Sequence, residues 1–332
     1  MTDVVALAAE LLAMDSTTGQ EGPAVDFVAR WLVARGWNVT LQEVTPGRSN
    51  VWASRRGHGV TLSTHLDTVP PYVKPTLEGE RLFGRGACDA KGIVAAMLVA
   101  ADALVAEGEE RVDLLFVVGE EGGSDGARAA NGLPATSRFL INGEPTESTL
   151  ASGAKGSLRV TLRTRGRAAH SAYPQLGQSA ILPMLELLQD LHALELPHDP
   201  VLGRSTLNVG VIRGGAEANI IPERCEAEMM VRLVGPVEPV QAVIERVVGE
   251  RAEVRYGSHI PAQHFQVLPG YPAAPVAYTS DIPLLSRWGT PLLYGPGSIT
   301  VAHTSDEHID LPDLREAART YAALVRSLLA GT

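Results

Sequence analysis

The chain alternates strand-like and helical runs, and one block with a different pattern interrupts this alternation. The first part contains strand-like runs at 37–44, 50–54, 59–64, 113–118 and 138–142. Helical runs at about 91–107 and 125–131 lie among them. Strands that alternate with helices, with central strands apolar on both faces, are typical of an α/β domain. The alternation resumes with a helical run at 282–288 and a strand-like run at 291–294, and it ends in a helical run at 311–330.

The interrupting block begins near Ala151, where every second residue becomes apolar. Leu158, Val160 and Leu162 alternate with polar residues, as expected for a sheet with one solvent-exposed face. The order of elements in the block is β-α-β-β-α-β, which is the ferredoxin-like arrangement. We therefore predict an α/β fold in which a mixed-sheet domain, at 1–151 and 259–332, is interrupted by an inserted ferredoxin-like α+β domain at 152–258.

Composition limits the partners and the cellular location. The 332 residues include 28 Lys and Arg against 38 Asp and Glu, a net charge of −10, which disfavours nucleic acid or an anionic membrane as a partner. The most apolar run, at 93–106, is shorter than the ~20 residues of a membrane span and contains Asp102. Cys88 and Cys225 form no Cys-x-x-Cys pair, which fits a reducing compartment. We expect a soluble cytoplasmic protein.

Histidines and carboxylates stand where strands of the predicted α/β sheet end, or in a loop just before a helix. They are His65 and Asp67, Glu120 and Glu121, Glu144, His303, and Asp89 within the glycine-bracketed loop 84–92. Such groups gathered at one dry sheet edge would repel one another unless divalent metal neutralised them. Imidazole and carboxylate ligands suit zinc, or manganese and cobalt in a similar site. Five ligands with one shared carboxylate are enough for two ions, which can activate a shared water.

Each of these signals has an ordinary alternative. A single His-x-Asp is more often a polar turn, and adjacent glutamates are usually a solvated face. The loop Gly84-x-Gly86-x-x-Asp89 is similar to a dinucleotide-binding loop, but an Asp replaces the third glycine and no strand pattern precedes it. No Gly-Lys-Ser/Thr phosphate loop is present either, so a nucleotide-dependent oxidoreductase or kinase is disfavoured.

Taken in order, several segments resemble the M20 metallopeptidase/aminoacylase family, which includes acetylornithine deacetylase, succinyl-diaminopimelate desuccinylase, carboxypeptidase G and aminoacylase. The resemblance runs nearly end to end. The segments that carry it are Ser63–Pro70, Gly84–Gly86, Asp89–Gly92, Gly119–Gly122, Gly143–Pro145, Gly166 with Ala169–Ser171, Asn219–Pro222 and Ala302–Thr304.

The resemblance implies a site with two divalent metal ions. Zinc is the expected metal, and cobalt or manganese are the alternatives. One ion would be held by His65, Asp89 and Glu144, and the other by Asp89, Glu121 and His303, so that Asp89 bridges the pair. Asp67 would orient His65 through the free ring nitrogen. Glu120 would be the general base.

The resemblance also implies roles for residues outside the metal site. His170, in the inserted domain, would stabilise the developing oxyanion in a neighbouring subunit. Asn219 and Arg232 would bind the substrate α-carboxylate, for which a guanidinium is well shaped. Gly295 and Gly297 would line the same pocket. The inserted domain would then serve as a lid and dimerisation domain of a homodimer.

Two positions depart from the family pattern. Ile93 stands where a second glycine usually follows Lys91-Gly92, and Cys88 precedes Asp89. Neither change removes a predicted ligand. The chain is also short for the family, so we expect shortened loops around the pocket.

The predicted function is a metal-dependent hydrolase that removes the acyl group from an N-acyl amino acid. The segment Gly295-Pro296-Gly297, followed after five intervening residues by His303, is most similar to acetylornithine or acetylcitrulline deacetylases, which implies a place in arginine biosynthesis. An M20 dipeptidase or carboxypeptidase, which would take a dipeptide, is the nearest alternative, and a desuccinylase is the next. A catalytically silent metal-binding relative is disfavoured because Glu120 is present.

Overall fold

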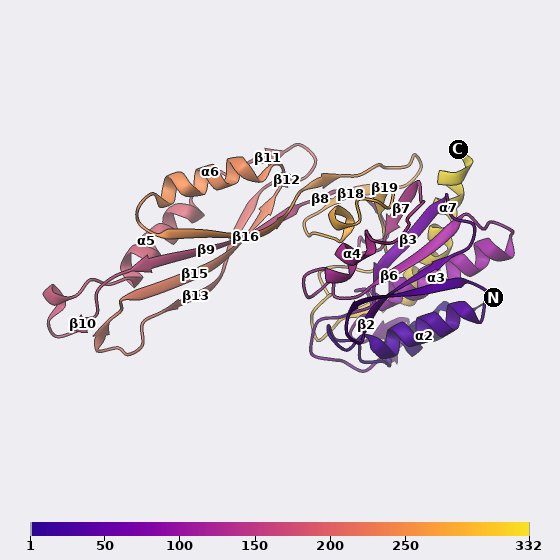
Figure 1. Ribbon diagram of the computed structural model, residues 1–332, viewed down its shortest axis with the longest axis horizontal. Coiled ribbons are helices and arrows are strands. Elements are labelled where there is room, and N and C mark those ends of the chain that lie inside the picture. The colour runs from indigo at the N-terminus through magenta and orange to yellow at the C-terminus, as the bar shows by residue number, and fades with distance from the viewer. Residues whose placement is uncertain (1, 332) are drawn as a thin grey trace. The chain divides into compact units, whose positions relative to one another are not determined.

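The computed structural model describes residues 2–331, except for the side chain of Ser258, and it divides into two compact units (Figure 1). Unit 1 comprises the described residues up to Ser152, Phe265–Ala274, and the described residues from Ser280 onward. Unit 2 comprises Gly153–His264 and Pro275–Thr279. The inserted block therefore extends six residues beyond the predicted end at 258, and it also takes in a short later segment.

Unit 1 is built on a six-stranded mixed sheet with the strand order β1-β2-β6-β3-β7-β19. Strand β2 runs antiparallel to both β1 and β6, whereas β6, β3, β7 and β19 are mutually parallel. The strands are β1 (Asn38–Thr45), β2 (Arg48–Ser54), β3 (Val60–His65), β6 (Val112–Val117), β7 (Phe139–Asn142) and β19 (Thr290–Leu293).

Helices cover this sheet because each presents an apolar face. The helices of unit 1 are α1 (Val4–Leu12), α2 (Gly22–Val33), α3 (Lys91–Ala106), α4 (Asp125–Ala130) and α7 (Leu311–Ala330), with a 3-10 turn η2 (Ile282–Leu284). Helix α3 packs on β3, β6, α1 and α7. It is Ala-rich and buried along most of its length, as are all six residues of β3 and of β6. This burial on both faces explains why the two central strands are recognisable as apolar runs.

The parallel strands bring their carboxyl ends to one edge of the sheet. His65 is the last residue of β3, Glu120 and Glu121 follow β6, Glu144 follows β7, and Gly295 follows β19. Chain segments far apart in sequence therefore converge at this edge, which is where open α/β sheets present their ligands.

A small three-stranded sheet supports the loop that carries Asp89. It has the order β20-β5-β4 and consists of β4 (Thr76–Glu78), β5 (Arg81–Phe83) and β20 (His308–Asp310). Strand β5 leads directly into Gly84, so the expectation that no strand precedes this loop is wrong. Only Leu82 of the three residues in β5 is buried, which leaves too little apolar pattern to predict the strand.

Unit 2 contains a four-stranded antiparallel sheet with the order β13-β15-β9-β16. Its elements follow one another as β9 (Gly156–Arg165), α5 (Ile181–His192), β13 (Thr206–Gly214), β15 (Arg224–Leu233), α6 (Val237–Val248) and β16 (Glu253–Ile260). Helices α5 and α6 pack against each other and against one face of the sheet (Figure 1). A separate apolar core, which includes Leu158, Leu187 and Val231, fills this layer.

The remaining elements are short. A three-stranded sheet of order β17-β8-β18 includes strands β8 (Leu150–Ala154), β17 (Gln263–His264) and β18 (Ala273–Val276). Two-stranded pairs join β10 (Ala169–His170) to β14 (Ile220–Ile221) and β11 (His198–Asp199) to β12 (Gly203–Arg204), and η1 spans Pro174–Leu176. The helical run expected at 282–288 is only the single turn η2, because the backbone leaves the helical conformation at Leu285, which has φ −100° and ψ 37°.

Candidate active site

The carboxylate of Asp89 lies between two histidines from distant parts of unit 1. Its Oδ1 is 3.0 Å from Nε2 of His65, and its Oδ2 is 3.2 Å from Nε2 of His303. His303 Nε2 also lies 2.8 Å from Oε1 of Glu121. Ligand atoms of His65, Asp89 and Glu121 all lie within 4.8 Å of one another. Four of the five predicted metal ligands therefore meet at the carboxyl edge of the sheet, with Asp89 at the centre.

The loop after β3 orients His65. Its Nδ1 lies 2.9 Å from the backbone carbonyl oxygen of Asp67 and 3.5 Å from the Asp67 carboxylate. The backbone carbonyl is thus the closer partner of the ring nitrogen. The carboxylate itself accepts the backbone N–H groups of Glu120 and Glu121, at 3.0 and 3.1 Å, and the hydroxyl of Thr18 at 2.8 Å. Asp67 therefore holds both the His65 ring and the start of the glutamate loop.

Hydrogen bonds with carboxylates raise the pKa values of both histidines. Burial alone would lower the pKa of His65, but its contacts with Asp67 and Asp89 raise it well above the usual value. Contacts with Asp89 and Glu121 raise the pKa of His303 to about 10. Burial would raise the pKa of Asp89, but the two histidines lower it. Without an ion, protons on the imidazoles balance the carboxylates.

The two remaining acidic groups of the predicted site, Glu120 and Glu144, have raised pKa values, chiefly because of burial. Burial and neighbouring carboxylates raise the pKa of Glu144 well above its usual value. Its Oε1 is buried and has no hydrogen-bond partner among the described residues. Burial and the negative charge of Asp281 likewise raise the pKa of Glu120. A raised pKa suits a carboxylate that must take up a proton and then release it.

Two acidic residues near the ligands were not singled out from the sequence. Asp281 is only 2% exposed. Burial raises its pKa to about 6, although a hydrogen bond with the Ser124 hydroxyl opposes part of that increase. Glu307 is buried and accepts the backbone N–H of Gly86 and, more weakly, that of Asp89. The signal for Glu307 was its position four residues after His303; Asp281 stands in a polar loop with no pattern that predicts burial.

The donor set fits divalent metal ions. Two imidazole nitrogens and three carboxylates from separate elements converge, and the buried Oε1 atom of Glu144 lacks a partner that a cation would supply. Clustered carboxylates of this kind are stable when a cation coordinates them. His65, Asp89 and Glu144 can hold one ion, and Asp89, Glu121 and His303 a second.

The two glycines predicted to line the pocket pack tightly against ligand-bearing segments. A Cβ atom at Gly295 would lie 2.3 Å from the backbone oxygen of Glu144, and one at Gly297 would lie 2.6 Å from Cβ of Cys88. Gly297 also has a positive φ of 81°. Only glycine fits these positions, because any side chain would push apart the segments that carry Glu144 and Asp89.

The other predicted residues lie in unit 2, in two groups. His170 pairs with Ile220 across β10 and β14, and the Ser171 N–H donates to the Asn219 carbonyl at 2.9 Å, so His170 and Asn219 are neighbours. Arg232 lies eight residues beyond Arg224 along β15. Eight extended residues span roughly 26 Å. Asn219 and Arg232 of one chain therefore lie near opposite ends of β15 and do not meet.

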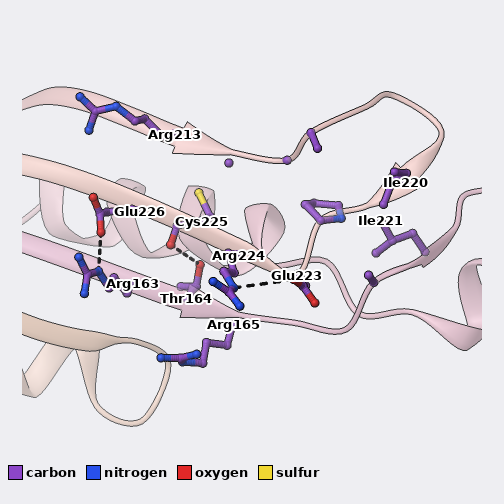
Figure 2. A pocket seen from close by; sticks show the side chains of 15 residues that line it. Arg163, Thr164, Arg165, Arg213, Ile220, Ile221, Glu223, Arg224, Cys225 and Glu226 are labelled. Carbon is purple, nitrogen blue, oxygen red and sulfur yellow. Dashed lines mark hydrogen bonds and ion pairs between the residues drawn. The ribbon is translucent and has the colours of Figure 1, made fainter.

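Unit 2 also contains a groove of about 770 Å³ beside the end of β15 that is nearer Asn219. Figure 2 shows Arg163, Arg165, Arg213 and Arg224 around it. Each of these guanidiniums lies within 4.0 Å of a carboxylate; the partners are Glu226, Glu253, Glu228 and Glu223. None of the five predicted metal ligands lines the groove. The positive charges of its four arginines are each paired with a glutamate of unit 2.

Comparison with known proteins identifies the family. Residues 61–327 match the family model described as Peptidase family M20/M25/M40. The chain belongs to the M20 peptidase family. A peptidase M20 domain-containing protein of Schizosaccharomyces pombe is 38% identical, over 97% of this chain and 84% of the relative. A protein of Aspergillus clavatus named "Probable carboxypeptidase" is also 38% identical, over 97% of this chain and 82% of its own length.

Solved structures of M20 peptidases share the fold. A tripeptidase from Staphylococcus aureus superposes with a TM-score of 0.83 at 22% identity, covering 98% of this chain and 97% of that chain. A metallo-carboxypeptidase from Sulfolobus solfataricus gives a TM-score of 0.78 at 18% identity, covering 98% and 99%. A dinuclear metal-binding peptidase from Bacillus subtilis gives 0.73 at 17% identity, covering 98% and 97%.

Membership of this family confirms the prediction of an M20 enzyme, a metal-dependent hydrolase of amide bonds. The curated relatives point to carboxypeptidases, the alternative named above, and nothing in them supports acetylornithine deacetylation. Among the described residues, no helix combines the length and the apolar character that a membrane crossing requires. The homodimer, the cytoplasmic location and the link to arginine biosynthesis stay predictions.

Proposed function

We propose that this M20 enzyme is a carboxypeptidase-type hydrolase with two zinc ions, which cleaves the amide bond preceding a free C-terminal residue of a dipeptide or short peptide. The observation that carries the proposal is the position of Asp89, one oxygen facing His65 and the other facing His303. A carboxylate that presents its two oxygens to two separate ligand groups is suited to bridge a pair of ions.

Two ions held by the five ligands would polarise the scissile carbonyl and lower the pKa of the attacking water. Glu120 would take a proton from that water at its carboxylate and pass it to the nitrogen of the leaving residue. Asp67 supports this role because it fixes the backbone N–H of Glu120. Asp67 also sets the His65 ring through its backbone carbonyl.

We assign substrate recognition to Arg232 and Asn219, as the family resemblance implies. Arg232 is half-buried, burial lowers its pKa, and it has no ion-pair partner among the described residues. A half-buried guanidinium without an anionic partner is suited to bind a carboxylate in a bidentate manner. We therefore propose that it binds the free α-carboxylate of the substrate's C-terminal residue.

The separation of Asn219 and Arg232 supports the predicted homodimer. Asn219 lies near the start of β15 and Arg232 lies near its end. In a single chain the two residues are therefore too far apart for one small substrate to touch both. We propose that unit 2 is a ferredoxin-like lid and dimerisation domain whose His170 and Asn219 serve the partner's site, with His170 stabilising the developing oxyanion.

Acetylornithine deacetylation remains the second candidate, because an N-acetyl amino acid offers the same amide and α-carboxylate. It rests on the segment that runs from Gly295 to His303. The identity of 35–38% to curated relatives named as carboxypeptidases favours the peptidase.

The test is a substrate panel with purified zinc-loaded enzyme, in which the primary amine released by each cleavage is measured. The panel contains dipeptides, their C-terminal amides, N-acetylornithine and N-succinyl amino acids. We expect cleavage of dipeptides, loss of cleavage when the C-terminal carboxylate is amidated, and a raised KM for Arg232→Ala. Preferred cleavage of N-acetylornithine would replace the carboxypeptidase assignment, and equal cleavage of the amides would refute carboxylate recognition.

A further inference from the structure

A buried ion pair lies beside the predicted metal ligands without belonging to them. Arg85 and Glu307 are each 2% exposed, and a guanidinium nitrogen, Nη1, of Arg85 donates to Oε2 of Glu307. The two residues are 222 positions apart in sequence. An ion pair removed so completely from water is maintained only where its remaining donors and acceptors are also satisfied. The contacts of this pair therefore indicate what it holds in place.

The Glu307 side chain holds the loop that ends in Asp89. Its Oε1 accepts the backbone N–H of Gly86 at 2.8 Å and that of Asp89 at 3.3 Å. The backbone carbonyl of Glu307 accepts the N–H of Gly84 at 3.0 Å. One residue thus receives three backbone N–H groups from the six-residue loop 84–89, which fixes the path of the chain into Asp89.

The Arg85 side chain holds the segment that carries His303. Besides Glu307, its Nη1 donates to the backbone carbonyl of Thr304 at 3.2 Å. Its Nε donates to the carbonyl of Pro71 at 3.3 Å. The planar guanidinium can serve these acceptors together, which a lysine ammonium on a flexible stem cannot do in the same geometry.

His303 needs such support more than the other ligands do. Its side chain is 46% exposed, and its backbone has a positive φ of 65°, which is strained for a residue with a side chain. By contrast, His65 ends a fully buried strand and is oriented by the carbonyl of Asp67. The two ligand groups on either side of Asp89 are therefore held by different means.

We propose that Arg85 and Glu307 are positioning residues that clamp the Asp89 loop to the His303 segment, and so set the affinity for the ion between Asp89, Glu121 and His303. This inference rests on the dinuclear site of the proposed function. Residues that orient metal ligands without touching the metal typically change metal affinity by about 10–100-fold when they are replaced. We expect the clamp to act on one ion more than on the other.

The experiment is a titration of the chelator-treated full-length protein with Co²⁺, followed by its visible absorption, and repeated with Zn²⁺ by calorimetry. The variants are Glu307→Gln, Arg85→Met and the conservative Arg85→Lys. The matched control is Arg81→Gln, which breaks the exposed Arg81–Asp310 pair between β5 and β20, the strands next to Arg85 and Glu307 in the sequence. Thermal unfolding of each metal-free variant reports whether it is folded.

For the wild-type protein we expect two bound ions. In Glu307→Gln and Arg85→Met, one ion should bind about 10–100-fold more weakly while the other changes less. Arg85→Lys should restore only part of that affinity, because it keeps the positive charge but lacks the planar guanidinium that donates to several acceptors at once. Arg81→Gln should leave both affinities within about twofold, as expected for an exposed ion pair.

Two results would overturn the inference, and they differ in what else they affect. If the wild type binds two ions and folded Arg85→Met and Glu307→Gln bind both as tightly, the clamp has only a structural role and the proposed function stands. If the wild type binds fewer than two ions, the dinuclear site and the clamp both fail. If Glu307→Gln does not fold, the comparison of Arg85→Met and Arg85→Lys with Arg81→Gln decides in the same way.

Discussion

The carboxylate of Asp67 accepts the backbone N–H of Glu120 at 3.0 Å. This hydrogen bond ties the loop that follows His65, the last residue of β3, to the loop after β6, which carries the proposed general base. The second Asp67 oxygen accepts the N–H of Glu121 at 3.1 Å. One carboxylate therefore fixes the relative positions of a metal ligand and the base beside it, before any substrate is present.

Replacing Asp67 with asparagine should loosen this arrangement. An amide has one acceptor oxygen, so it cannot accept the N–H groups of Glu120 and Glu121 on two separate oxygens. We expect kcat to fall by about 10–100-fold with a smaller change in KM, and metal affinity to fall within the same range. Steady-state kinetics and buffered zinc titrations measure both, and wild-type values in both would contradict the role given to Asp67.

Replacing Glu120 with glutamine should separate catalysis from metal binding. The variant keeps the shape of the side chain but cannot accept a proton from water, so kcat should fall at least ~10²-fold. Metal content by elemental analysis should stay at the wild-type value, because Glu120 is not one of the proposed ligands. Glu10→Gln, on the exposed side of α1, is the control. Turnover near the wild-type rate would remove Glu120 from the mechanism.

Metal affinity should increase with pH. The pKa of His303 is raised to about 10 in the metal-free protein, and that of His65 is also raised. The imidazole of His303 therefore carries a proton at neutral pH and must lose it to bind an ion. Each displaced proton makes affinity rise about tenfold per pH unit below the pKa. Zinc titrations between pH 6 and pH 8 measure the slope, and an affinity independent of pH would contradict the protonated metal-free site.

A buried carboxylate away from the site should destabilise the protein at high pH. Asp113 in β6 is 3% exposed, and burial raises its pKa to about 6. Because the folded pKa lies above the unfolded one, stability is lost as pH rises from about 4 through 6. Asp113→Asn removes this loss and should gain about 1–2 kcal/mol at pH 8. Its gain should vanish at pH 4.

Denaturant unfolding of the wild type and of Asp113→Asn at both pH values makes the comparison. Asp26→Asn, at an exposed position of α2, is the control and should not reproduce this difference. A gain at pH 4 equal to that at pH 8 would mean that side-chain shape, rather than ionisation, is responsible.

The sequence predicts the parts of this protein that depend on local pattern. Strands β3 and β6 are apolar throughout because both of their faces are buried, and His65 and Glu120 were found because they follow such strands. The placement of His65, Glu121 and Glu144 at one edge follows from the order of the parallel strands.

Long-range and irregular features could not be predicted in this way. Arg85 and Glu307 contact across 222 positions, and no periodicity relates them. Asp281 is buried in a loop, where its burial depends on segments that pack around it. The separation of Asn219 from Arg232 follows from the straight course of β15, which a motif comparison does not reveal.

The central claim is that Asp89 bridges two metal ions. Anomalous diffraction at the zinc absorption edge, on crystals of the zinc-loaded protein, tests it directly. We predict two peaks about 3.5–4 Å apart on either side of the Asp89 carboxylate, one beside His65 and Glu144 and the other beside Glu121 and His303. A single peak, or two peaks that do not share Asp89, would contradict the claim.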